Sequence, residues 1–338
     1  MIDFVLSEMT FLRYFAPLSK EFTMCNFYYD YSGKYNCPTR PENYAKLEKF
    51  CKENNFGLKP IAELKNSTSN VLILIEGVLA DKCSKLKTYK KIISISYQTD
   101  FINLYKSYKN KVDNIILPSN FMKNYYGLSK DDKVLGIGSP KYGVRLNKKE
   151  ILSKYNLNSK LKYILVVYPK LRDLEKIDMD LLYNCIRSKG YNIIVKARGK
   201  EQARENHKGD YYFQDYSWHP HTTMELTKIS DLVINFGSSG IKEFVMLEKP
   251  IINFNIKPKE QIKHTVEFLY DYNYCVNHER NFFSRDVDHN NILLDNIDYL
   301  TNTDLSNEFK RSIDNHLFES KNGCKNIFNL IESGGYLK

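Results

Sequence analysis

The residues best suited to chemistry form the turn Gly237-Ser238-Ser239-Gly240, which directly follows an apolar run at 232–235. Such small residues let successive backbone N–H groups converge at the N-terminus of the next helix, where the helix dipole favours a phosphate by about 0.3–1 kcal/mol. Glu243 lies one helical turn further along. An ordinary helix cap is the alternative interpretation, because Ser and Gly are common at that position.

Two cations, Lys196 and Arg198, lie at the end of another apolar run at 193–195. Ligands of open α/β sheets bind outside the carboxyl ends of the strands, so we expect both cations to face the same crevice as the turn, with solvated side chains as the alternative. His219 and His221 precede a predicted helix, and we expect them to line this pocket or to cap that helix. No carboxylate or Cys is spaced to complete a metal site with them, so no metal is predicted.

A reaction at a hydroxyl group needs a base, and three carboxylates follow predicted strands in the first half of the chain: Asp100, Glu8 and Glu76. Asp100 is the first choice, because Gln98 and Thr99 beside it offer neutral hydrogen-bonding groups suited to a sugar. Each of the three carboxylates has a helix-capping role as its alternative.

The elements that must position these residues alternate along the whole chain, short apolar runs with amphipathic helical stretches. This pattern is typical of βαβ units and a parallel sheet. Strands are expected at 2–6, 22–29, 71–75, 91–96, 114–117, 134–137, 163–167, 192–195, 211–213, 232–235 and 251–254. Helices are expected at 11–22, 42–54, 120–126, 149–155, 178–188, 222–229, 240–247, 307–318 and 324–333. The predicted fold is α/β, with two Rossmann-like domains in tandem.

The division between the domains is expected in the lysine-rich stretch 139–162, which combines a Ser-Pro step with a glycine. Residues 1–145 then form an N-terminal, acceptor-side domain. Residues 146–338 form a C-terminal, nucleotide-donor-binding domain that is closed by the helices at 307–318 and 324–333.

The net charge of +10 is concentrated in the first half. Residues 1–150 hold 24 Lys and Arg against 15 Asp and Glu, whereas residues 151–338 hold 26 against 25. The lysines cluster at Lys82, Lys85, Lys87, Lys90 and Lys91, and again at Lys106, Lys109 and Lys111. They predict attraction to an anionic partner, a membrane surface or a phosphorylated acceptor, with a solvated face as the alternative. Nucleic acid is not an expected partner, because no spacing typical of a nucleic-acid-binding motif is present.

Composition narrows the class of protein further. Apolar runs are far shorter than the roughly 20 residues that cross a bilayer, and Asp3 stands where a signal peptide would be basic. We therefore expect a cytoplasmic protein, with peripheral association at the inner face of the cell membrane as a further expectation. The seven cysteines are odd in number and contain no CxxC pair, which predicts reduced thiols and argues against structural zinc. No cofactor is expected.

The order of four segments resembles glycosyltransferases of the GT-B fold, near the CDP-glycerol glycerophosphotransferases and the capsule and lipopolysaccharide transferases. The segments are 134–142 (VLGIGSPKY), 163–172 (YILVVYPKLR), 193–199 (IIVKARG) and 230–254, and the resemblance covers roughly residues 90–256. It implies an active site in the cleft between two domains. It also implies that Ser238, Ser239 and Gly240 hold the donor phosphate and that Glu243 binds the donor ribose.

The sequence departs from the glycerophosphotransferase pattern at two positions. Asn235-Phe236-Gly237 replaces the Asp-Tyr that precedes the paired serines, and Asn255-Ile256-Lys257 replaces acidic residues after the next strand. The turn is also similar to that of UDP-GlcNAc 2-epimerases. Thr39-Arg40-Pro41-Glu42 imitates their N-terminal motif but does not follow the first strand, and we interpret it as coincidence.

Together these features predict a metal-independent glycosyltransferase that moves a sugar from a nucleotide-sugar donor to a surface polysaccharide or glycolipid acceptor. Three alternatives stay open. The protein could transfer a polyol phosphate such as glycerophosphate, act as a nucleotide-sugar 2-epimerase or hydrolase, or bind a nucleotide without catalysis.

Overall fold

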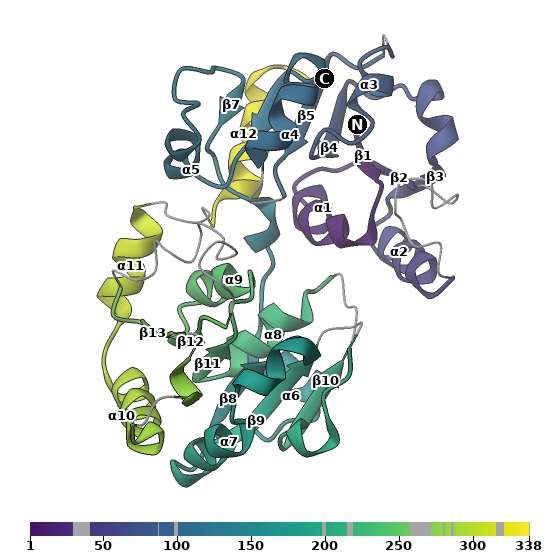
Figure 1. Ribbon diagram of the computed structural model, residues 1–338. Helices are drawn as coiled ribbons and strands as arrows, with labels where there is room; N and C mark the ends of the chain where they lie inside the picture. The colour runs from purple at the N-terminus through teal and green to yellow at the C-terminus, as the bar shows by residue number, and fades with distance from the viewer. Residues whose placement is uncertain are drawn as a thin grey trace. The chain divides into compact units, whose positions relative to one another are not determined.

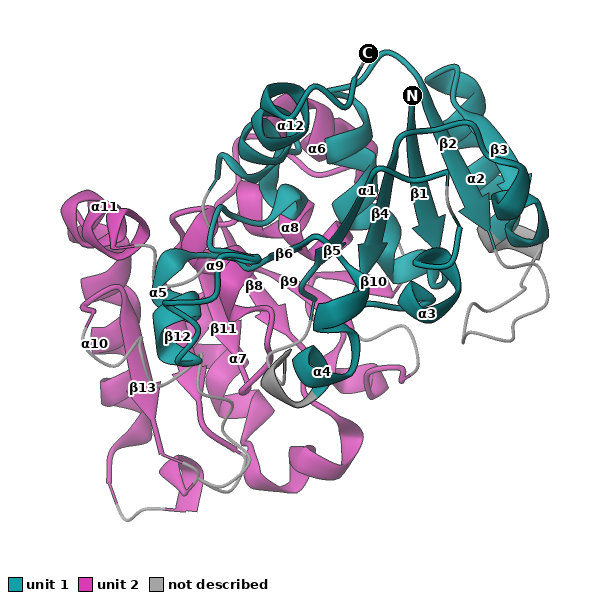
Figure 2. Ribbon diagram, turned by 90° about the horizontal axis from the view of Figure 1, so that it is seen from above, with its two compact units in different colours: residues 1–144, 316–338 teal, residues 145–315 magenta. Residues whose placement is uncertain are grey.

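The chain folds into two compact units in the computed structural model (Figures 1 and 2). Unit 1 comprises Met1–Val144 and His316–Lys338, and unit 2 comprises Arg145–Asn315. The structure describes residues 1–29, 41–86, 88–97, 101–197, 201–214, 219–256, 272–279, 281–284, 287–315 and 321–337. Three candidate residues therefore lie outside the described residues: Lys87, Asp100 and Arg198. The first half of the 39–42 motif also lies outside them.

Unit 1 contains a seven-stranded parallel sheet with the strand order β3-β2-β1-β4-β5-β6-β7. The strands are β1 (Ile2–Leu6), β2 (Cys25–Tyr29), β3 (Gly57–Pro60), β4 (Val71–Ile75), β5 (Lys91–Ile95), β6 (Asn114–Ile116) and β7 (Val134–Leu135). The sequence did not predict β3, because this edge strand is only half-buried and contains Gly and Pro in place of an apolar run.

Helices cover the sheet of unit 1 on both faces. They are α1 (Leu12–Ser19), α2 (Pro41–Glu53), α3 (Ala80–Cys83), α4 (Phe101–Tyr108), α5 (Asn120–Tyr125) and α12 (Gly323–Ser333), with short 3-10 turns η1 (Met9–Phe11), η2 (Ile61–Asn66), η3 (Lys109–Lys111) and η4 (Pro140–Tyr142). On one face, alternate strand residues such as Leu72, Leu74 and Ile92 pack against Tyr105 and Tyr108 of α4. All five residues of β4 are buried, which is what a parallel sheet with both faces covered requires.

The sequence analysis assigned the last helix to the C-terminal domain, but α12 belongs to unit 1. Its first residue, Gly323, lies so close to Ser139 that a Cβ atom would come within 2.4 Å of the Ser139 carbonyl. Asn326 Nδ2 donates to the Ile137 carbonyl at 2.8 Å, and the ring of Phe328 lies 5.4 Å from that of Phe22. The chain therefore returns at its end to the unit in which it began.

Unit 2 contains a six-stranded parallel sheet with the order β10-β9-β8-β11-β12-β13. The strands are β8 (Tyr163–Val167), β9 (Asn192–Ala197), β10 (Tyr211–Gln214), β11 (Leu232–Asn235), β12 (Ile251–Phe254) and β13 (Cys275–His278). Counted along the chain, this is the 3-2-1-4-5-6 order of a Rossmann fold. The sequence did not predict β13, because its four residues include the polar Asn277 and His278.

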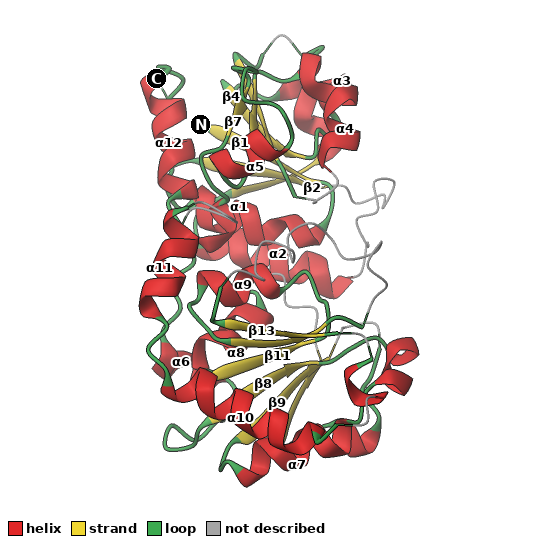
Figure 3. Ribbon diagram, turned by 60° about the vertical axis from the view of Figure 1, so that its left-hand side comes forward, coloured by secondary structure: helices red, strands yellow, loops and turns green. Residues whose placement is uncertain are grey.

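The helices of unit 2 lie on both faces of its sheet (Figure 3). They are α6 (Lys148–Lys154), α7 (Met179–Ser188), α8 (Thr222–Ile229), α9 (Ile241–Met246), α10 (His289–Asn302) and α11 (Ser306–Asp314), with 3-10 turns η5 (Leu171–Lys176), η6 (Glu205–His207) and η9 (Phe282–Ser284). Helices α7 and α10 pack together on one face, and α6, α8 and α9 lie on the other. The prediction of two Rossmann-like α/β domains is thus confirmed.

Six cysteines fall in the described residues, and all six are free and buried. Burial in apolar surroundings raises the pKa of five thiols to about 12: Cys25, Cys51, Cys83, Cys275 and Cys324. Burial likewise raises the pKa of the Cys185 thiol. None of the described helices has the length and apolar character needed to span a membrane.

Candidate functional site

The turn Gly237–Gly240 lies at the carboxyl end of β11 and leads directly into α9. Strand β11 pairs with β8, which is where the strand order of the sheet reverses direction. In open α/β sheets this switch point is where a crevice forms for a ligand. The turn therefore has the position in unit 2 that the sequence predicted for it.

The backbone of the turn is held by side chains of the protein itself. Gly237 has a φ of 62°, a left-handed conformation that favours glycine. The Gly237 amide donates to Asn253 Oδ1 at 3.3 Å, the Ser238 amide to Asn235 Oδ1 at 3.3 Å, and the Gly240 amide to Ser238 Oγ at 3.2 Å. We had expected the amides of the whole turn to face a phosphate, whereas these three already have acceptors and Ser239 is the exposed residue of the turn.

Glu243 lies in the first turn of α9 and is only 3% exposed. Its Oε1 lies 3.7 Å from Nδ1 of His221, the residue that precedes α8. The sequence analysis named both residues as candidates for one pocket but did not predict a contact between them, and the fold places their side chains next to each other. A buried carboxylate beside an imidazole next to a polar turn is a group that can accept hydrogen bonds from ligand hydroxyls.

The other donor-side candidates have different surroundings. Lys196 is buried at the carboxyl end of β9, where its ammonium donates to the Ala197 carbonyl at 2.7 Å. Strand β9 pairs with β8, so Lys196 lies on the strand next to the switch point. His219 is half-buried two residues before His221. Arg198 lies outside the described residues.

In unit 1, Glu8 and Glu76 belong to one chain of contacts at the carboxyl ends of β1, β4 and β5. Glu8 Oε2 accepts from Thr10 Oγ1 at 3.0 Å, and the Thr10 carbonyl accepts from Arg13 Nε at 3.1 Å. Arg13 Nη2 donates to the Tyr97 hydroxyl at 3.0 Å, and the Tyr97 amide donates to Glu76 Oε1. Two carboxylates 68 positions apart in sequence thus share one polar network.

Sequence reasoning missed Arg13 and Tyr97, the residues that join these two carboxylates. Arg13 is the one basic residue inside the apolar stretch that forms α1, and such an isolated cation was the available signal. Tyr97 directly follows β5, at the same edge of the sheet as Glu76. Asp100, the first-choice base, lies outside the described residues.

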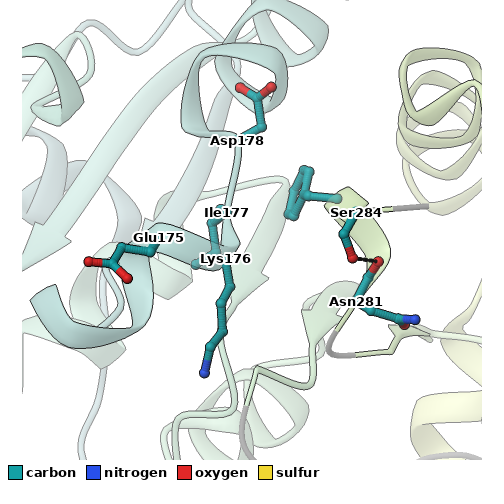
Figure 4. Close-up of a pocket in the computed structure, with 7 residues that line it drawn as sticks. Glu175, Lys176, Ile177, Asp178, Asn281 and Ser284 are labelled. Carbon is teal, nitrogen blue, oxygen red and sulfur yellow. Dashed lines mark hydrogen bonds between the residues drawn. The ribbon is translucent and has the colours of Figure 1, made fainter. Parts of the chain in front are cut away.

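A pocket of about 600 Å³ lies elsewhere in unit 2, between the segment that joins η5 to α7 and the turn η9 (Figure 4). Its lining mixes both charges with neutral groups, namely Glu175, Lys176, Ile177, Asp178, Asn281, Phe283 and Ser284. Ser284 Oγ donates to the Asn281 carbonyl at 2.9 Å. None of the candidate residues from the sequence lines it. In the described part of the chain, no three His, Cys, Asp or Glu side chains gather as a metal site would require.

The two sheets with their flanking helices define the class of the fold, two Rossmann-like domains in one chain. No protein-family model and no curated protein matches the sequence. Solved structures do match. The wall teichoic acid polymerase TagF, in a histidine variant, superposes with a TM-score of 0.62 at 13% identity, covering 99% of this chain and 88% of its own.

Two further structures extend this comparison. A UDP-N-acetylglucosamine 2-epimerase has a TM-score of 0.60 at 12% identity, covering 99% of this chain and 96% of its own. A glycosyltransferase from Rickettsia africae ESF-5 has a TM-score of 0.51 at 16% identity, with 100% and 98% covered. At these identities the likeness concerns the fold. The chain has the GT-B fold that the resemblance of its segments implied.

Proposed function

We propose that this protein is a glycosyltransferase that moves a sugar from a nucleotide-sugar donor to a glycan or glycolipid acceptor. The observation that carries the proposal is the buried Glu243 paired with the half-buried His221, beside a polar turn at the switch point of unit 2. In this proposal, the Glu243 carboxylate accepts hydrogen bonds from the donor ribose. The N–H and hydroxyl of Ser239 contact the donor phosphate, and Lys196 contributes positive charge nearby.

The acceptor hydroxyl needs a base at the carboxyl edge of unit 1. Asp100 stays our first candidate for that role, and Glu8 is the second. Glu76 ranks below both, because its carboxylate accepts from the backbone amide of Tyr97 and so fixes the loop after β5, whereas Glu8 accepts from the Thr10 hydroxyl within its own loop. Arg13 and Tyr97 then hold the loops that carry these acids.

The donor site is tested by nucleotide binding. A thermal-shift panel of UDP, GDP, CDP, CMP and dTDP identifies the ligand, because a ligand at 100 times its Kd adds about 2.7 kcal/mol of native-state stability. Hydrogen bonds to a charged group contribute about 1.5–3 kcal/mol each, so Glu243→Ala should weaken calorimetric binding of that nucleotide by roughly one to two orders of magnitude.

Glu225→Ala is the matched control for this variant. Glu225 is also a buried glutamate of unit 2, but it accepts from Lys154 Nζ at 2.7 Å and from the Tyr155 hydroxyl at 2.6 Å, between α6 and α8. Its loss should reduce stability and leave nucleotide affinity within about twofold. Ser239→Asp places a fixed negative charge where the donor phosphate is proposed to lie, so it should also weaken nucleotide binding. Equal affinity in wild type, Glu243→Ala and Ser239→Asp would mean that the turn is a helix cap and would remove the main support for the proposal.

The second candidate function is a nucleotide-sugar 2-epimerase or hydrolase. It is favoured by the 2-epimerase structure, which matches along nearly its whole length. Such an enzyme turns over its nucleotide sugar with no acceptor present, whereas a glycosyltransferase does not release the nucleotide at a comparable rate. Incubation with the donor alone therefore separates the two. Release of CMP from a CDP-polyol only when a glycan or glycolipid acceptor is added would instead indicate a polyol-phosphate transferase.

We further propose that unit 1 docks on an anionic membrane surface through its lysines. Lys90 precedes β5 and Lys91 begins it. Lys109 and Lys111 precede β6, and Lys133 precedes β7. Because the strands are parallel, these lysines gather at the amino edge of the sheet, opposite the edge of Glu8 and Glu76. That position supports a role in docking the protein rather than in contacting the acceptor hydroxyl.

A further inference from the structure

Three asparagines form a ladder across the strands next to the switch point of unit 2. Asn235 of β11 is in register with Asn253 of β12, which is in register with Asn277 of β13. Asn235 Nδ2 donates to Asn253 Oδ1 at 2.8 Å, Asn253 Nδ2 donates to Asn277 Oδ1 at 2.9 Å, and Asn277 Nδ2 donates to the Cys275 carbonyl at 3.3 Å. The amides of Asn235 and Asn253 thus donate in the same direction, from β11 towards β13.

The ladder ends on the backbone of the turn Gly237–Gly240. The same Oδ1 of Asn253 that accepts from Asn235 also accepts from the Gly237 amide, and Asn235 Oδ1 accepts from the Ser238 amide. Asn235 Nδ2 also lies 3.4 Å from the Ser238 carbonyl. Both asparagines are 0% exposed, so water does not compete for these bonds.

We propose that Asn235 and Asn253 are positioning residues that fix the turn so that Ser239 faces the donor phosphate. The inference rests on the proposed donor site. Two properties of asparagine carry it, because each of these side chains must accept from a backbone amide while donating to the next residue. A carboxylate offers acceptors alone, and an aliphatic side chain offers neither.

The test uses Asn253→Asp, which keeps the size of the side chain and removes its donor. The aspartate still accepts from Asn235 and from the Gly237 amide, but it meets the oxygens of Asn255 and Asn277 where it had donated. The ladder must shift, and the turn shifts with it. We expect the affinity for the nucleoside diphosphate identified in the panel to fall about tenfold or more, measured by calorimetry at a temperature where the variant is folded.

The free nucleoside of the same base distinguishes positioning from general damage. In our proposal the nucleoside contacts Glu243 and not the turn, so its affinity, measured by ligand-observed NMR, should change less than twofold in Asn253→Asp. The ratio of diphosphate to nucleoside affinity therefore falls. Asn114→Asp is the control, because Asn114 is another buried strand asparagine, in β6 of unit 1, and its variant should keep the wild-type ratio.

An unchanged ratio in folded Asn253→Asp would overturn the inference and leave the ladder as strand packing. If Asn253→Asp does not fold, Asn253→Ser, which is smaller and uncharged, is measured in the same way and by the same criterion. The proposed function fails separately. If Glu243→Ala and Ser239→Asp bind nucleotide normally, both proposals fall, whereas if they bind weakly while the Asn253 ratio is unchanged, the ladder proposal alone fails.

Discussion

Single residues in this fold have their chemistry set by burial, and His207 of η6 is the clearest case for pH. The Tyr168 hydroxyl accepts from the Arg204 amide at 3.2 Å and shares a hydrogen bond of 2.8 Å with His207 Nδ1. Burial lowers the pKa of His207, and the nearby Arg204 lowers it further, whereas Asp180 acts in the opposite direction.

The sign of the pH dependence follows from that lowered pKa. Below about pH 6.5 the unfolded chain binds a proton at His207 that the folded chain does not, so the free energy of unfolding should fall on acidification and stay level above that pH. His207→Gln keeps an acceptor for Tyr168 without titrating. Urea unfolding at pH 5.5, 6.5 and 7.5 should therefore show a steeper loss for wild type than for the variant, and parallel curves would refute the assignment.

At the scale of residues, the sequence could predict where the turn Gly237–Gly240 lies but not what its amides contact. Small residues after an apolar run mark a strand end regardless of the rest of the fold. The contacts of Gly237 and Ser238 depend on Asn253, whose position beside β11 is set by strand pairing and not by sequence distance. The pairing of His221 with Glu243 was hidden for the same reason.

At the scale of elements, the docking of α12 on unit 1 depends on close approach at Gly323. A Cβ atom there would lie 2.4 Å from the backbone of Ser139, and backbone cannot move aside as a side chain can. We expect Gly323→Ala to loosen α12 and to lower the free energy of unfolding by about 1–3 kcal/mol. Limited proteolysis should cut the variant near α12 first.

Ser333→Ala is the control for this helix, because Ser333 is exposed near its end. Alanine there should change stability by no more than about 0.5 kcal/mol. A Gly323→Ala protein with wild-type stability and proteolysis would mean that the start of α12 is free to shift.

The sequence predicted α12 as a helix from its periodic apolar residues, but nothing in a helical pattern says which of two sheets it covers. The sequence did not predict β13 and α10 for a different reason, because both follow a stretch where the apolar pattern weakens.

For the molecule as a whole, the uneven charge predicts salt-dependent binding to anionic vesicles. Replacing Lys82, Lys85, Lys90 and Lys91 by Gln should weaken co-sedimentation with vesicles of equal phosphatidylcholine and phosphatidylglycerol at least tenfold, because each lysine near such a surface contributes about 1 kcal/mol. Binding of wild type should disappear at 1 M salt, where the screening length is about 3 Å.

The matched control for the vesicle experiment replaces Lys148, Lys149, Lys160 and Lys162 of unit 2, which are exposed and carry the same total charge. These replacements should leave vesicle binding nearly unchanged. Equal losses in both variants would assign the effect to net charge, and no binding at low salt would make the lysines a solvated surface. Composition could predict an attraction to anionic surfaces, but only the parallel strand order places Lys90 and Lys91 at the same edge of the sheet as Lys109, Lys111 and Lys133.

The buried thiols make the protein well suited to fluorescence spectroscopy. With a pKa near 12, the thiols of Cys25, Cys51, Cys83, Cys275 and Cys324 hold almost no thiolate at neutral pH, and thiolate is the form that reacts with maleimide dyes. Once Cys37 is replaced by Ser, a cysteine introduced at an exposed position of each unit should take up dye selectively. Energy transfer between the two dyes would then report any change in the distance between the units when the nucleotide identified in the panel is added.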